Sequence, residues 1–310
     1  MATTGRSSDR TDAESKNAME EHNKYPDARS FVYLNVLGNS FHTSPARKGQ
    51  SLSEAQLTHE HRMALKGRID KGMHVLDCGC GAGGPARSIA TLTGARVTGI
   101  NISKYELNAA REVTKKMNLE HLCDFKEASF DELPFDEGTF DRVISIEAVL
   151  HAKDSRRVFS EIYRVLKPGG IYISHDWAMK EKYDESNSEH RQIIKSMVDN
   201  YGLYGLETTS KLEQFFRDCG FNILETGDFS DDSQVHWTEY LEQEGGLLTS
   251  WLGDRFFFPF IYLLETLRIA PKGTLSVVDL MDKAKVAMIR GGKLGILTSM
   301  AMFIVQKPAA

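Results

Sequence analysis

The sequence has few cysteines and no apolar run that is long enough to cross a membrane. Its 310 residues include 4 cysteines, which are too few and too scattered for a disulfide framework. Cys78 and Cys80 lie in a glycine-rich stretch without metal-ligand spacing, so the sequence predicts no metal site. A membrane span needs about 18 apolar residues and a signal peptide needs an apolar segment near the start, and neither occurs. We therefore expect a cytoplasmic protein.

Residues 1–30 lack valine, isoleucine, leucine, phenylalanine, tryptophan and cysteine. Such a segment cannot bury enough apolar surface to offset the entropy of ordering, so a disordered tail is predicted there. With 41% hydrophobic and 26% charged residues, the whole chain nevertheless has the composition of a globular protein. Its formal net charge of -5 argues against a nucleic-acid partner, which would favour a basic surface.

Short apolar runs alternate with helical patterns from residue 73 onward. Strands are predicted at 74–77, 96–100, 141–145, 170–174, 221–226 and 301–306. Helices are predicted at 53–68, 84–92, 104–117, 155–166 and 211–219. This alternation predicts an α/β fold in which helices cover both faces of a parallel sheet.

The most informative stretch is the glycine-rich run at residues 75–84, between a predicted strand and a predicted helix. Its glycines permit a tight turn and let a ligand approach the backbone beside a helix N-terminus. The run also satisfies G-x-G-x-x-G, so a dinucleotide remains an alternative. However, Asp77 would repel a pyrophosphate and could instead face a cationic amino-acid group. Asn101 replaces the acidic residue that usually holds a ribose.

Three motifs in order resemble class I S-adenosylmethionine-dependent methyltransferases: Leu-Asp-x-Gly-x-Gly at 76–81, Leu-Pro-Phe at 133–135 and Leu-Lys-Pro-Gly-Gly at 166–170. The resemblance implies a Rossmann-like sheet that binds S-adenosyl-L-methionine. Where the family commonly has an acidic residue for adenine, this chain has Ser129 and Phe130, which could contact and pack against the purine. The cofactor-binding residues that it implies are Asp77, Cys78, Gly79, Gly81, Asn101, Ile102, Ser129, Phe130 and Ile146.

Further segments, from residue 31 to residue 308, are similar to the sterol C-methyltransferase family. They lie at residues 39–42, 59–61, 146–152, 175–177, 182–191, 267–274 and 291–298. The resemblance implies methyl transfer from S-adenosylmethionine to a sterol, at C-24 of a Δ24 side chain. Members that act at C-24 typically have Tyr-Glu-Tyr-Gly-Trp-Gly where this chain has residues 32–39. Methylation of a nuclear carbon such as C-4, or of another lipophilic or amine substrate, therefore remains an alternative.

The same resemblance indicates catalytic residues. Glu147 is expected to bind substrate or stabilise charge, His151 to act as a base, and Glu60 to contact the sterol hydroxyl or a cation. Asp176 is a further acidic candidate, and Tyr33 and Trp177 are candidate aromatic walls. Each of these side chains could instead cap a helix or pack in the core.

The sequence divides into five expected parts. These are a tail (1–30), a cap (31–72), a cofactor-binding core (73–230), a helical lid inserted before the last strand (231–296) and that last strand (297–310). The block at 231–296 contains an aromatic run. From residue 256 onward the sequence is basic, with 7 Lys and Arg against 3 Asp and Glu. It could cover a sterol, rest on a sterol-containing membrane such as the endoplasmic reticulum, or form a core or dimer contact.

Overall fold

Helix α2 (Pro26–Val32) is the first helix of the described chain, a computed structural model that covers residues 24–244 and 251–309. Most of the expected tail, residues 1–23, lies outside this range. The expected tail boundary at residue 30 is wrong, because α2 already begins at Pro26 and buries Ala28 and Ser30. The first turn of a helix favours proline, because the N–H that proline lacks would have no partner there anyway.

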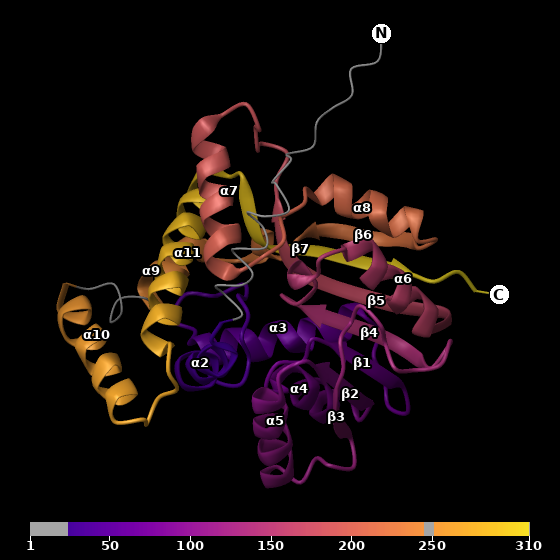
Figure 1. The fold of residues 1–310 in the computed structure, drawn as a ribbon. Coiled ribbons are helices and arrows are strands. Elements are labelled where there is room, and N and C mark those ends of the chain that lie inside the picture. The colour runs from indigo at the N-terminus through magenta and orange to yellow at the C-terminus, as the bar shows by residue number, and fades with distance from the viewer. Residues whose placement is uncertain (1–23, 245–250, 310) are drawn as a thin grey trace.

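Within the described chain, seven strands form one sheet in the order β3-β2-β1-β4-β5-β7-β6 (Figure 1). Strands β1 to β5 pair in parallel, whereas β7 is antiparallel to β5 and β6. The order reverses between β1 and β4, and ligands of open α/β sheets bind in the crevice at such a point. The strands are β1 (His74–Cys78), β2 (Arg96–Asn101), β3 (Cys123–Glu127), β4 (Phe140–Ile146), β5 (Leu166–Met179), β6 (Asn222–Asp228) and β7 (Leu297–Gln306).

The predicted strands and helices are confirmed, with ends that differ by a few residues. Strand β3 is missing from the predicted strands. It lies at the edge of the sheet, and polar Asp124 and Lys126 separate buried Cys123 from buried Phe125, so no continuous apolar run marks it. The other helices are η1 (Tyr33–Leu37), α3 (Leu52–Lys66), α4 (Gly84–Thr93), α5 (Lys104–Lys116), η2 (Val149–His151), α6 (Ser155–Val165), α7 (Ser188–Tyr201), α8 (Thr209–Asp218), η3 (Phe229–Asp232), α9 (Trp237–Glu244), α10 (Trp251–Thr266) and α11 (Thr274–Leu294).

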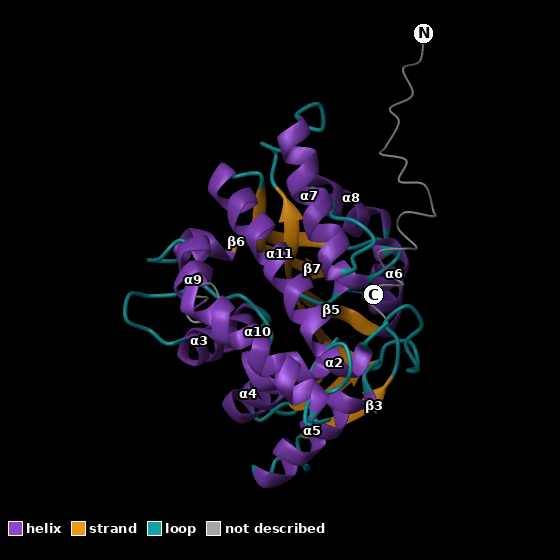
Figure 2. Ribbon diagram, turned by 60° about the vertical axis from the view of Figure 1, so that its left-hand side comes forward, coloured by secondary structure: helices purple, strands orange, loops and turns teal. Residues whose placement is uncertain are grey.

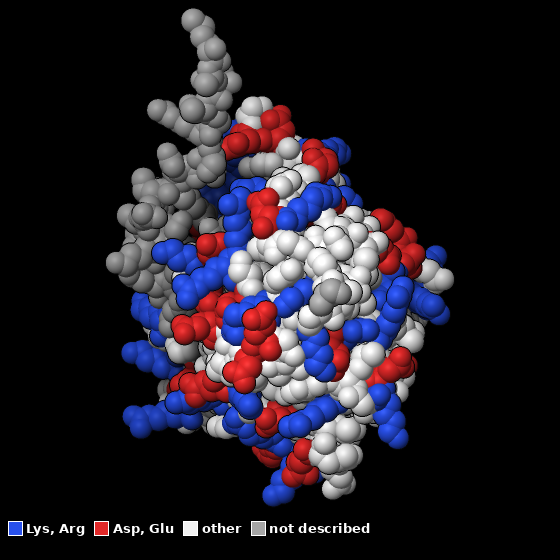
Figure 3. All heavy atoms as spheres, turned by 90° about the vertical axis from the view of Figure 1, so that its right-hand side faces the viewer, with Lys and Arg blue, Asp and Glu red and all other residues white. Residues whose placement is uncertain are grey.

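Helices pack on both faces of the sheet, as the alternating pattern predicts. One buried cluster joins the sheet to α3, α4, α5, α7 and α11, and a second joins it to α6 and α8. Phe159 and Phe216, from α6 and α8, have ring centroids 4.2 Å apart on that second face. On the side of the molecule that carries α6 and α8, Lys and Arg mix with Asp and Glu (Figure 3). That side therefore lacks the single-sign basic surface typical of nucleic-acid binding.

Along the chain, α9, α10 and α11 come between β6 and β7. Helix α10 lies on the outer side of α11 (Figure 1 and Figure 2). This arrangement explains why β7 is antiparallel, unlike the other strands. Strand β6 ends at the carboxyl edge of the sheet, and β7 begins beside the end of β5, with Leu297 paired to Met179. Because the chain re-enters the sheet at the same carboxyl edge at which β6 leaves it, β7 must run antiparallel to β5 and β6.

Candidate functional site

A cavity of about 620 Å³ lies at the carboxyl ends of β1 and β4, within the usual range of small-molecule sites. At one end it is lined by residues that follow β1, β2 and β3. At the other end it is lined by aromatic and apolar side chains from the C-terminal half, namely Trp177, Tyr201, Tyr204, Trp237, Leu241, Phe258, Val278, Met281, Met288 and Met300. One space therefore joins a polar end to an apolar one.

The polar end is built on the glycine-rich turn after β1. Gly79 and Gly81 line the cavity with φ angles of 91° and 50°, a region that favours glycine. A Cβ atom on Gly79 would lie 2.4 Å from that of Ala148, so a larger residue would push β1 away from the turn after β4. Predicted Cys78 does not line the cavity, because it is buried in the cluster under α6 and α8. Its neighbour Cys80 lines the cavity instead.

Asp77 lies beside this turn and is 2% exposed. Its Oδ2 atom accepts no hydrogen bond from any described residue. Burial, together with the nearby Glu60 carboxylate, raises the pKa of Asp77 to about 7. A buried carboxylate without a partner at the edge of a cavity fits a ligand that brings a positive charge. The structure therefore fits the expected cationic amino-acid group.

The ends of β2 and β3 bring Asn101, Ile102, Ser129 and Phe130 to the cavity, as the sequence predicts. The Asn101 amide donates a 2.6 Å hydrogen bond to the Glu106 carboxylate, which also lines the cavity. A carboxylate is therefore present near the end of β2 after all.

Sequence reasoning missed Glu106, which comes from the first turn of α5. The signal was Ser103, the N-cap of that helix, followed three residues later by a glutamate. Asp131 was also not predicted. The Ser129 hydroxyl donates to its Oδ2 atom at 3.1 Å, and Asp131 lines the cavity two residues beyond the position where an acid was sought.

Glu147 follows β4 and lines the cavity, next to Ala148, which faces Gly79 of the glycine turn. Its φ angle of 48° is unusual for a residue with a side chain. The conformation is held by a 2.7 Å hydrogen bond from its N–H to the His175 carbonyl. The Glu147 side chain is only 8% exposed, and burial raises its pKa although hydrogen bonds from Thr43 act in the opposite direction.

His151 also lines the cavity, one turn beyond Glu147, at the end of η2. Burial, with a smaller effect of the Arg29 charge, lowers the pKa of His151 to about 4, so its ring is neutral at physiological pH. Asp176 does not line the cavity. Its carboxylate instead accepts the backbone N–H groups of Leu150 and Trp177 at 3.0 and 3.1 Å. It thereby anchors the turn that carries His151.

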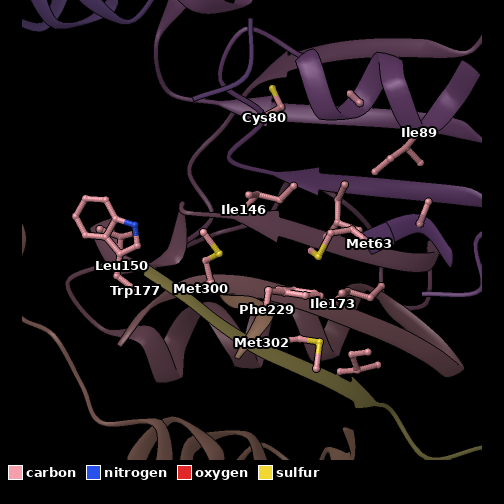
Figure 4. Packing of buried hydrophobic residues seen from close by; sticks show 14 of the residues in the cluster. Met63, Cys80, Ile89, Ile146, Leu150, Ile173, Trp177, Phe229, Met300 and Met302 are labelled. Carbon is pink, nitrogen blue, oxygen red and sulfur yellow. The ribbon is translucent and has the colours of Figure 1, made fainter. Parts of the chain in front are cut away.

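Aromatic rings surround Glu147, as expected for Tyr33 and Trp177, which both line the cavity. Tyr201, at the end of α7, was not predicted and packs edge-on against Trp177 with centroids 4.7 Å apart. Figure 4 shows Trp177, Leu150, Ile146 and Met300 together at one end of the buried cluster. Aromatic faces next to a carboxylate form a surface that can stabilise a positive charge.

Glu60 is placed differently from the prediction. It is 2% exposed and does not line the cavity. The Ser40 hydroxyl donates to it at 2.6 Å, and the His42 ring lies 3.3 Å away. Burial lowers the pKa of His42, but Glu60, together with the Thr43 backbone and the Glu147 charge, outweighs burial, so the pKa is raised overall. Glu60 therefore anchors the segment around Ser40 and His42 rather than facing the cavity directly.

The fold and this site together define a methyltransferase of the Rossmann-like class. The family described as "Methyltransferase domain" matches residues 76–174. A solved structure of the cyclopropane synthase MmaA2 from Mycobacterium tuberculosis is similar, with a TM-score of 0.72, 18% identity, and coverage of 94% of this chain and 98% of that one. The geranyl diphosphate C-methyltransferase from Streptomyces coelicolor has a TM-score of 0.65 at 16% identity, covering 93% and 97%. At these identities the likeness concerns the fold alone.

The chain belongs to the sterol methyltransferase family. It is 38% identical to the sterol 24-C-methyltransferase ERG6 of Saccharomyces cerevisiae, over 87% of this chain and 74% of that protein. It is 35% identical to the cycloartenol-C-24-methyltransferase of Arabidopsis thaliana, over 92% and 86%. The family described as "Sterol methyltransferase C-terminal" matches residues 246–309, which include α10, α11 and β7.

Proposed function

We propose that this protein transfers a methyl group from S-adenosyl-L-methionine to C-24 of a sterol with a Δ24 double bond in its side chain. One observation carries the proposal: a single cavity is lined by the glycine turn, by apolar and aromatic side chains, and by Glu147. The names of the yeast and plant relatives support C-24 as the site of methylation.

The polar end of the cavity is assigned to the cofactor, which when bound supplies an electrophilic methyl group on a sulfonium. Asp77 would hold its cationic amino group, and the glycine turn would lie against its amino-acid portion. Glu106, oriented by Asn101, would accept hydrogen bonds from the ribose hydroxyls, and Phe130 would pack against adenine. Residues 73–230 thus form the proposed cofactor-binding core.

The apolar end is assigned to the sterol, with residues 231–296 as its proposed lid. The side-chain double bond would give its electron pair to the methyl carbon, the electrons of the broken carbon–sulfur bond would remain on S-adenosylhomocysteine, and a cation would be left on the sterol side chain. Glu147 and the rings of Tyr33, Trp177 and Tyr201 would stabilise that cation. Because Glu147 and Trp177 are already largely buried before reaction, little reorganisation is needed as charge develops.

The reaction ends with a hydride shift and loss of a proton from the sterol. His151 is assigned as the base, since its depressed pKa of about 4 leaves the ring neutral and able to accept a proton. Asp176 would position it through the backbone of η2. Glu60 would act through Ser40 and His42, not on the reacting atoms.

A peripheral contact with a sterol-containing membrane is part of the proposal. Among the helices that the structure describes, none has both the length and the hydropathy that crossing a bilayer needs. The exposed face of α10 and the turn after it nevertheless carry large apolar side chains, namely Phe260, Tyr262, Leu263, Leu267 and Ile269. Arg268 and Lys272 lie in the same turn and could contact anionic lipid.

The test is a sterol panel incubated with purified protein and isotopically labelled S-adenosylmethionine. The panel contains Δ24 sterols, their saturated-side-chain counterparts and 4-desmethyl stanols, with mass spectrometry of the extracted lipids. We expect label on the Δ24 members only, because a saturated side chain has no electron pair to donate. Label on the saturated or 4-desmethyl members would favour a nuclear carbon, and a protein that labels no sterol would overturn the proposal.

A further inference from the structure

Residues 39–46 form a strap that lies along the cavity and is held at both ends. Its first carbonyl accepts the backbone N–H of Gly84 at 3.1 Å, and its last residue pairs with Val235. Between these points the side chain of Gln56 donates to two strap carbonyls at 2.6 and 3.1 Å. Thr43, in the middle of the strap, therefore has a fixed position.

Thr43 makes two hydrogen bonds to one oxygen of Glu147. Its backbone N–H and its hydroxyl donate to Oε1 at 2.7 and 2.5 Å. The hydroxyl lies 3.4 Å from the carbonyl of Ser299, so its one proton goes to the nearer carboxylate. Both Thr43 donors act on Oε1, and the Trp177 side chain is a further group whose interaction lowers the pKa of this carboxyl group. Since Glu147 lines the cavity, Thr43 leaves Oε2 to partners other than itself.

A second buried carboxyl group competes with Glu147 for the negative charge. Burial, and then the charge of Glu147, hold the pKa of Asp176 well above its usual range. Thr43 hydrogen bonds lower the pKa of Glu147 against the effect of burial, so they favour ionisation of Glu147 over Asp176. The titratable groups that face Glu147 from neighbouring elements are His42, Tyr33, His175, Asp176 and Tyr201.

We propose that Thr43 is a positioning residue that holds Glu147 ionised, with Oε2 directed toward the cation that forms on the sterol side chain. The inference rests on the proposed function, because that function supplies the cation. It adds a residue that lies outside the cofactor motifs and does not itself touch the reacting atoms. The hydroxyl, rather than the bulk of the side chain, is the group that matters.

The test compares binding of two sterol analogues by calorimetry across a range of pH. One analogue carries a quaternary ammonium in its side chain in place of the cationic carbon, and the other carries a neutral carbon of the same shape. We expect the wild-type protein to prefer the ammonium analogue, with a preference that fades as Glu147 is protonated at low pH. Thr43→Val should lower this preference about tenfold, the effect of losing one hydrogen bond to a charged group, and should move its pH midpoint upward.

Thr43→Ser, which keeps the hydroxyl, should restore both the preference and the midpoint. Thr139→Val is the matched control, because the Thr139 hydroxyl donates to a carbonyl on an exposed turn far along the chain. Thr43→Ala, which adds no branched side chain, replaces the valine variant if that variant does not fold.

An unchanged preference and midpoint in Thr43→Val would overturn the role of Thr43, and so would an equal loss of affinity for both analogues. A wild-type protein that binds both analogues alike would contradict the proposed cation site at Glu147, and the role of Thr43 with it.

Discussion

At the scale of single residues, the site depends on carboxylates kept in unfavourable surroundings. Glu147 adopts a positive φ, which costs about 1–3 kcal/mol for a residue with a side chain, and it is nearly buried. Two hydrogen bonds from Thr43 and one to the backbone of His175 offset that cost. Asp77 is buried with an oxygen that no described residue contacts. Both are more favourable when a positive charge lies in the cavity.

Glu147→Gln should lower kcat about 100-fold, because it removes the negative charge and keeps the shape of the side chain. Affinity for S-adenosylmethionine should change little, since Glu147 is assigned to the sterol cation and Asp77 to the cationic group of the cofactor. Steady-state kinetics with a Δ24 sterol, and calorimetry with the cofactor, would measure the two effects. Glu112→Gln, on the exposed face of α5, is the matched control. A variant with near-normal kcat would remove Glu147 from the mechanism.

Asp77→Asn should stabilise the free protein and weaken cofactor binding. The folded-state pKa of about 7 lies above the ordinary value of 3.8, so the native state keeps a proton that the unfolded chain releases. Wild-type stability therefore falls as pH rises from about 4 to about 7, by an amount of order 1–4 kcal/mol. The variant lacks this fall, so its advantage should grow over that interval and then stay constant.

Urea unfolding without cofactor at several pH values would measure this advantage, and calorimetry would measure cofactor affinity. Asp124→Asn, on the exposed side of edge strand β3, should change neither quantity. A destabilised Asp77→Asn protein, or one that binds the cofactor normally, would show that the carboxylate serves the fold and not the ligand.

Residues that line the cavity were mostly predictable where a motif fixed their position, with Cys78 as an exception. The glycine turn, Glu147 and His151 all line the cavity, as the motifs imply. Glu106 was missed because its role depends on the first turn of α5 returning toward β2, which a linear motif does not encode. Glu60 was misplaced because its motif does not reveal that the strap, through Ser40 and His42, separates it from the cavity.

At the scale of elements, α10 has an outer face that carries exposed apolar side chains. It packs on α11, and its outer face leaves Phe260 54% and Leu263 50% exposed. An exposed apolar face next to basic residues is typical of a surface that contacts lipid. Phe258 of the same helix lines the cavity. Contact of α10 with lipid would therefore place the sterol entrance near the bilayer.

Phe260→Ser and Leu263→Ser should each weaken binding to anionic, sterol-containing vesicles about tenfold, because each removes an apolar side chain from the contact. Flotation assays would measure binding, and turnover of detergent-dispersed sterol should stay normal. Leu65→Ser is the control, since Leu65 is 74% exposed on α3, which lies outside the proposed membrane contact. If all three variants float like the wild-type protein, α10 does not contact the membrane.

Most elements were predictable because apolar periodicity and caps are local signals. Helix α3, for example, begins with a complete capping box between Ser51 and Glu54. Two features were not local. Helix α2 is stabilised by packing against Val277 of α11, far along the chain, and β7 reverses direction only because the inserted helices return it to the edge that β6 leaves.

At the scale of the whole molecule, the position of the cavity follows from topology. The sheet order reverses between β1 and β4, which leaves a crevice at their carboxyl ends, and the helices inserted before β7 add apolar side chains to that crevice. The proposed cofactor core and the proposed sterol-binding block thus share one space. We propose that methyl transfer in this space takes place at the sterol side chain.

The most direct test is the position of the label in the product. Purified protein would be incubated with trideuteromethyl S-adenosylmethionine and a Δ24 sterol, and the product fragmented by mass spectrometry. We expect that all of the label retained by the sterol is found in the side-chain fragment, on the carbon attached to C-24. Label that stays with the ring system would contradict it and assign the reaction to a nuclear carbon.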